Sequence, residues 1–157
     1  MSSKPLTAAR RPLVRALLAA LAVLVAAGCG SSTLSAAELR QQAGAICSRA
    51  DRQIARIPNP SSEAAGNAFL KQGIAALDPE LGDLKSFKPP ADEAVVYQSA
   101  IKALGGELDA LKSAATKLDQ GADPVHTFRA LQDTLAPLET DADNAWRALD
   151  IPPCVSR

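Results

Sequence analysis

Aromatic residues are scarce in this chain. Its 157 residues include one tryptophan, one tyrosine and three phenylalanines, or 3% in total. Strands favour aromatic and β-branched side chains, and both are sparse here, which argues against a sheet. Alanine and leucine are abundant instead, which is typical of helices that pack closely through small residues. The composition therefore predicts an all-α protein.

Histidine and methionine are scarcer still. His126 is the single histidine, and the only methionine is Met1. The chain has no Cys-x-x-Cys-His sequence for haem attachment and no Gly-x-Ser-x-Gly elbow. One histidine cannot complete a di-metal set, and it disfavours a Ser-His-Asp triad. We therefore expect a protein that is not an enzyme, with no catalytic residues, metal or cofactor, and with His126 solvated in the first turn of a helix.

The first part of the chain lacks an apolar run long enough to span a membrane. The stretch from Ala16 to Gly28 has 13 residues, whereas crossing the hydrocarbon core takes about 20. Four basic residues precede it, as in an export signal. Small residues then lead directly to Cys29, an arrangement that resembles a bacterial lipobox. We expect a cleaved signal peptide over residues 1–28; ordinary secretion with an unpaired Cys29 is the alternative.

The lipobox resemblance implies a diacylglyceryl thioether on Cys29. Two acyl chains are enough for stable anchoring, at about 0.8 kcal/mol for each buried methylene. Residues 29–34 are then a lipidated tether, small and polar after the cysteine. The expected location is the extracytoplasmic face of the cell membrane, held through the lipid at Cys29.

An excess of basic charge is also missing. The chain has 17 basic and 17 acidic residues, and four of the basic ones lie in the expected signal peptide, so the remaining 129 residues carry a net charge of −4. Nucleic-acid binding needs a basic face, and we expect none. A length of 129 residues fits one domain with a single core, here over residues 35–157.

Four stretches have helical periodicity. The first begins at a capping box, Ser35 to Glu38, and stops at Pro58. The second, over about 62–87, contains Pro79, so that a kinked helix and two short helices are both open, and the continuous apolar stripe favours the kink. A third lies over 90–121, and a fourth runs from about 123 to 149 with Pro137 inside it.

Short loops between these stretches predict antiparallel neighbours. We expect an up-down-up-down four-helix bundle, with a three-helix bundle containing a broken segment as the alternative. In an exported domain, Cys47 and Cys154 form an even pair that predicts a disulfide, against two free or metal-binding thiols.

This disulfide conflicts with the simplest bundle. An unbroken last helix would be about 39 Å long, whereas Cys47 lies only about 15 Å from the far end of the first helix. Five tail residues of about 3.3 Å each cannot span the gap. We therefore expect a break at Pro137, an offset between the helices, or a tail that folds back along the bundle.

Three segments carry a family resemblance. The sequence over residues 45–58, which includes Cys47, the pair Pro89-Pro90, and residues 145–150 followed by Cys154 resemble small uncharacterised exported lipoproteins of actinobacteria. The resemblance implies a disulfide-linked helical lipoprotein and no catalytic residues.

These observations predict a non-enzymatic, membrane-anchored module that contacts an envelope protein. A carrier or sensor that holds a small apolar or lipid-like ligand between helices is the alternative. Gly66, Gly73, Gly105 and Gly106 are the positions at which small residues would leave room for such a ligand. For the pair Gly105-Gly106, close approach of a neighbouring helix is the favoured explanation, ahead of a pocket.

Overall fold

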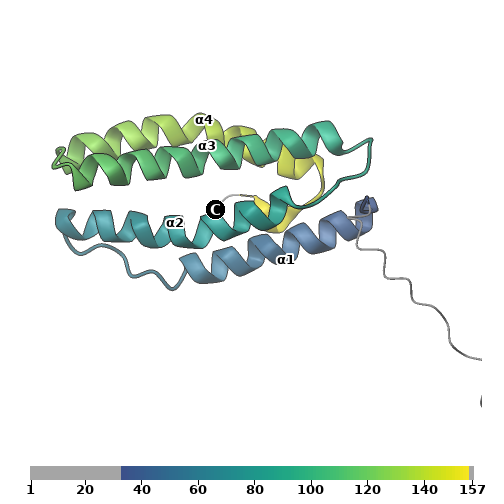
Figure 1. Ribbon diagram of the computed structural model, residues 1–157, viewed down its shortest axis with the longest axis horizontal. Helices are drawn as coiled ribbons and strands as arrows, with labels where there is room; N and C mark the ends of the chain where they lie inside the picture. The colour runs from purple at the N-terminus through teal and green to yellow at the C-terminus, as the bar shows by residue number, and fades with distance from the viewer. Residues whose placement is uncertain (1–32, 156–157) are drawn as a thin grey trace, which may run out of the picture. The chain divides into compact units, whose positions relative to one another are not determined.

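The computed structural model describes residues 33–155, except for the side chains of residues 63 and 64. This part contains four α-helices and no strand, so the all-α prediction is confirmed (Figure 1). The elements are α1 (Ala36–Ile54), α2 (Glu63–Lys85), α3 (Ala94–Asp119), α4 (Pro124–Ala148) and a short 3₁₀ helix, η1 (Pro152–Cys154). The expected signal peptide and Cys29 lie outside the described residues. No helix within residues 33–155 has the length and apolarity to cross a membrane.

Local sequence signals start the helices. The Ser35 hydroxyl accepts a hydrogen bond from the Glu38 backbone N–H at 3.3 Å, and the Glu38 carboxylate accepts from the Ser35 N–H at 2.8 Å. The capping box at the start of α1 is therefore confirmed. α4 begins in the same way, because Asp123 accepts from the N–H of His126 at 2.7 Å and Pro124 occupies the first helical position.

Two prolines lie inside helices without ending them. α2 continues through Pro79 and α4 through Pro137, so neither the two short helices around Pro79 nor the break at Pro137 occurs. Each proline removes the hydrogen bond to the carbonyl four residues earlier, on Ala75 and Asp133. The two prolines and the two residues that carry these carbonyls are all exposed. Solvent can therefore hydrate the freed carbonyls, which explains why the helices tolerate both prolines.

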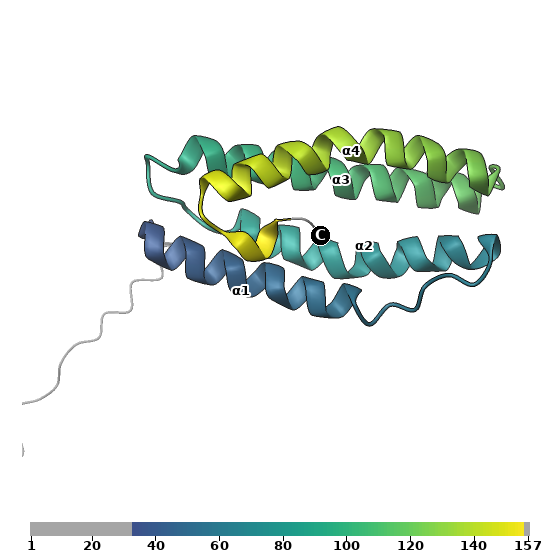
Figure 2. The ribbon, with the colours of Figure 1, turned by 180° about the vertical axis from the view of Figure 1, so that it is seen from behind.

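The chain reverses sharply after α4. Asp150 has a φ of 57°, and the N–H of Ile151 donates to the carbonyl of Trp146 at 3.0 Å, which is a Schellman turn with aspartate where glycine is usual. η1 then runs back beside α1, and Cys154 forms a disulfide with Cys47 at a Cα–Cα distance of 5.2 Å. The predicted disulfide is confirmed, and a tail that folds back is how it forms (Figure 2).

The helices pack as successive neighbours. α1 lies on α2, α2 on α3, and α3 on α4, while η1 contacts both α1 and α4. Among the described residues α1 and α4 do not pack directly on each other, so the tail occupies the space between them. α1 is shorter than the other three helices, with 19 residues against 23 to 26. It therefore covers only part of their length.

This difference in length divides the bundle into two halves. The closed half contains α1, η1, the disulfide and the larger core. Trp146 and Tyr97 meet there edge to face with ring centroids 5.9 Å apart, and the Tyr97 hydroxyl donates to the Leu84 carbonyl at 2.7 Å. The open half is built from α2, α3 and α4 alone, around Leu70, Ala114, Ala115 and Leu131.

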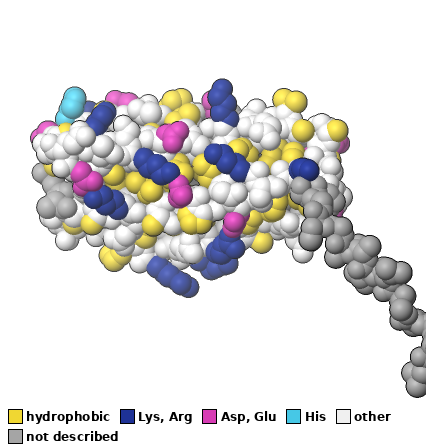
Figure 3. All heavy atoms as spheres, viewed as in Figure 1, with side chains coloured by type: hydrophobic (Ala, Val, Ile, Leu, Met, Phe, Trp, Pro, Cys, Tyr) yellow, Lys and Arg dark blue, Asp and Glu magenta, His cyan; other side chains and the backbone are white. Residues whose placement is uncertain are grey.

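Ion pairs join the helices on the outside. Charges of both signs are mixed over the face shown in Figure 3. Arg49 of α1 pairs with Asp83 of α2, and Lys71 of α2 pairs with Asp119 of α3 at 2.7 Å. Because these side chains are about half exposed, each pair contributes at most about 1 kcal/mol. The apolar cores provide most of the cohesion.

Candidate ligand groove

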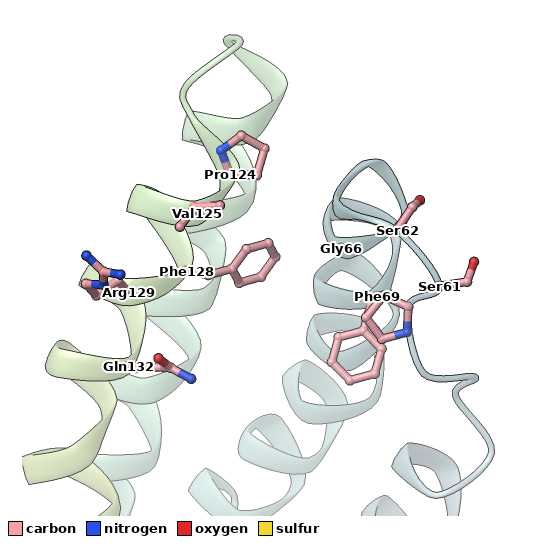
Figure 4. A pocket seen from close by; sticks show the side chains of 10 residues that line it. Ser61, Ser62, Gly66, Phe69, Pro124, Val125, Phe128, Arg129 and Gln132 are labelled. Carbon is pink, nitrogen blue, oxygen red and sulfur yellow. The ribbon is translucent and has the colours of Figure 1, made fainter.

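The open half carries a groove of about 630 Å³ between the first turns of α2 and α4, with the α1–α2 loop along one side (Figure 4). It lies beyond the end of α1 and is open to solvent. Volumes of roughly 300–1,000 Å³ are typical of small-molecule sites. The groove is lined by Pro60, Ser61, Ser62, Gly66, Phe69, Pro124, Val125, Phe128, Arg129 and Gln132.

Phe128 and Gly66 set the shape of the groove. Phe128 projects from α4 toward α2, and a Cβ atom at position 66 would lie 2.7 Å from its ring (Figure 4). Real Cβ atoms do not approach a ring so closely, so only glycine allows the ring this position. The ring is partly buried against the smaller core on one side. Phe69 of α2 supplies a second half-buried ring, and the groove thus has an aromatic group from each helix.

Arg129 is the single charged residue among those that line the groove. It is exposed, and no side chain among the described residues forms an ion pair with it. The N-terminal turns of α2 and α4 also border the groove, but the Asp123 carboxylate already caps α4. Arg129 is therefore the group that favours a negative charge at an otherwise mostly apolar surface.

The structure places the glycines that the sequence singled out. Gly66 lines the groove, as the ligand alternative requires, whereas Gly73 does not line it, and a Cβ added there would have no neighbour within 4 Å. At Gly106 a Cβ would lie 3.1 Å from Leu138 of α4, so close helix approach explains this glycine. At Gly105 a Cβ would make only an ordinary contact, at 3.9 Å from Leu81.

Neither the two described cysteines nor the histidine lines the groove. Cys47 and Cys154 are buried in the closed half as a disulfide. His126 is exposed in the first turn of α4, as expected, and is not among the lining residues. Within residues 33–155 no three side chains of the metal-binding types come together.

Sequence reasoning does not identify Phe69, Phe128 or Arg129 as a site. The periodic pattern places Phe128 only in the apolar stripe of the last helix. A usable signal is nevertheless present, because Phe69 and Phe128 each lie close to the start of their helix, in the second turn of α2 and the first two turns of α4. In an antiparallel bundle both rings therefore lie near the same end.

Two aromatic side chains with a polar group are buried in the closed half, Tyr97 and Trp146. Burial raises the pKa of the Tyr97 hydroxyl above its usual range, so this group stays protonated and donates its hydrogen bond to Leu84. The buried Trp146 Nε1–H has no hydrogen-bond partner in the described part of the chain.

Comparison with protein-family models, curated proteins and solved structures gave no match.

Proposed function

We propose that this protein is a membrane-anchored extracytoplasmic lipoprotein whose helical domain acts by binding an envelope protein, without catalysis. The signal peptide occupies residues 1–28, Cys29 carries the lipid, and residues 29–34 form the tether. The resemblance to exported actinobacterial lipoproteins belongs to the same proposal. The observation that carries the export argument is the buried disulfide between Cys47 and Cys154, because such bonds persist in oxidising compartments.

The packing of the helices supports the role of the domain as a binding module. We assign it the up-down-up-down order, supported by the succession of neighbouring helices and by their short connections. The described lining of the groove contains no histidine, cysteine or carboxylate, so it offers no nucleophile with a base beside it. Binding is the activity that such a surface supports.

Membrane fractionation with intact-mass measurement tests the anchor. The wild-type chain should sediment with membranes and carry the mass of an acylated Cys29, with residues 1–28 absent and two hydrogens lost to the disulfide. Cys29→Ser should abolish both acylation and cleavage. Ser32→Ala is the matched control and should behave as wild type. An unacylated wild-type chain would overturn the proposed location.

The groove favours a second candidate, a carrier or sensor for a small apolar or lipid-like ligand. Its volume and the two phenylalanines that line it provide an apolar surface of the size that such ligands use. Mass spectrometry under native conditions separates the two roles. A stoichiometric second protein supports the envelope module, whereas a retained small molecule supports the carrier.

A further inference from the structure

We propose that the groove binds a long-chain carboxylate, the chemical class of a fatty acid, with its hydrocarbon chain against Phe69 and Phe128 and its carboxylate on Arg129. This inference rests on the carrier candidate and specifies its ligand. The inference requires that the groove is largely apolar, that it has a cationic group at one end, and that its occupant is separate from this chain.

The apolar part comes from both helices. Phe69 of α2 and Phe128 of α4 expose part of their rings to the groove, and Val125 is 51% exposed at its rim. Pro60 and Pro124 also line the groove and add further apolar surface. In a domain whose other apolar side chains are mostly buried, this concentration of exposed apolar surface is what a hydrocarbon chain would cover.

The polar part lies on one side of α4. Val125 and Arg129 are four residues apart, as are Phe128 and Gln132, so the two pairs form adjacent rows on the side of α4 that borders the groove. Phe128 points toward α2, whereas Arg129 lies at the outer edge of this side (Figure 4). Along this side the apolar residues come first, near the end of the bundle, and the polar pair Arg129 and Gln132 follows. An amphiphile with one anionic head matches this order, because a guanidinium pairs with a carboxylate through two parallel hydrogen bonds.

The chain's own N-terminal segment does not supply the occupant. The backbone N–H of Leu34 donates to the carbonyl of Lys88 at 2.8 Å, which fixes residue 34 beside the C-terminal end of α2. The groove begins at Phe69, 16 residues before the end of this helix at Lys85, or about 24 Å away. The five steps from Cys29 to Leu34 span at most about 18 Å, so the polypeptide does not reach the groove. The acyl chains proposed on Cys29 carry no free carboxylate for Arg129, so we assign the groove to a free molecule.

Photolabelling of the full-length protein in its own membranes tests the ligand class. Two probes are used, a diazirine-bearing palmitate and the same chain ending in an alcohol, and labelled peptides are mapped by mass spectrometry. The palmitate probe should label residues 60–69 or 124–132, and excess palmitate should compete. Arg129→Gln should reduce this labelling about fivefold, the upper range for a solvent-accessible ion pair, to the level of the alcohol. Arg52→Gln removes the same charge from an exposed position of α1 and should have no effect.

A second variant tests the site itself. Val125→Trp places a large ring at the exposed rim, and it should block labelling by both probes while the helix content stays unchanged. Equal wild-type labelling by the two probes would overturn the carboxylate assignment and leave a carrier of neutral lipids. Absence of labelling in the groove with either probe would overturn both the inference and the carrier candidate.

Discussion

α2, α3 and α4 run through both the closed and the open half of the bundle, but the two halves are covered differently. In the closed half α1 and η1 cover α2 and α4, and the disulfide joins them over Trp146 and Tyr97. In the open half α1 has ended, and Phe69 and Phe128 remain partly exposed over a small core. The same packing rules thus give a sealed core where a fourth element is present and a groove where it is absent.

Removal of the disulfide should have the largest effect and should act on the closed half. For a loop of about 100 residues the chain-entropy model gives about 4.7 kcal/mol, and the separation here is 107. Urea unfolding of the double variant Cys47→Ser, Cys154→Ser should show a loss of stability of this order. Hydrogen exchange should increase first in α1. A loss below about 1 kcal/mol would mean that the tail is held by packing alone.

A matched pair of leucines compares the two cores. Leu104 is 1% exposed in the closed half, and Leu131 is 7% exposed in the open half. Replacement by alanine costs about 2–5 kcal/mol in buried sites, and least where neighbours can relax into the space. We expect Leu104→Ala to cost about 4 kcal/mol and Leu131→Ala about 2 kcal/mol, measured by urea unfolding. Equal costs would contradict the division into a tight half and a loose half.

Two glycines of α2 sharpen the description of the groove. Gly66→Ala places a methyl group against the Phe128 ring, so we expect a loss of about 1–2 kcal/mol. Gly73→Ala is the matched control, because nothing lies within 4 Å and alanine is the better helix former; it should gain about 0.5–1 kcal/mol. Thermal unfolding measures the change in stability of each variant. If the Phe128 ring moves aside freely, the two changes will be equal.

The smallest expected effect is the acid response of one carboxylate in each half. Hydrogen bonds from Ser35 lower the pKa of Glu38 in the closed half, and hydrogen bonds from Lys71 and Asn67 lower the pKa of Asp119 in the open half. Because both folded-state pKa values lie below the unfolded values, their stabilisation is present above those unfolded values and is lost as pH falls through the folded ones. Glu38→Gln and Asp119→Asn should therefore lower the melting temperature at pH 6 and have a smaller effect at pH 2. A difference of the same size at pH 2 would show that charge is not the cause.

The features that are predicted correctly from the sequence are local or covalent. The capping box at Ser35, the cap at Asp123 and the Cys47–Cys154 bond each depend on a few residue types at defined positions. A break at Pro137 is one of three expected ways to form this bond, and the structure uses another, the tail that folds back. The sequence does not reveal which way the helix around Pro137 faces, and so does not decide between them. An exposed position lets water satisfy the freed carbonyl, and exposure is a property of the folded state.

The groove is less accessible to prediction. Phe69 and Phe128 lie 59 residues apart in the sequence, and their place in one groove depends on where α1 ends relative to α2 and α4. Periodicity predicts the four helices but not the coverage of one helix by another. Gly66 stands out in the sequence, but only the structure shows why glycine is needed there: the ring of Phe128 leaves no room for a side chain.

The backward-folding tail also has a consequence for the order of assembly. α2, α3 and α4 are consecutive and joined by short loops, so most contacts of the open half join helices that follow one another in the chain. The closed half needs residues 47 and 154 to meet across 107 positions, and such distant contacts form slowly. We expect the groove to be shaped early, and the sealed core to be completed last by the final turn of the domain.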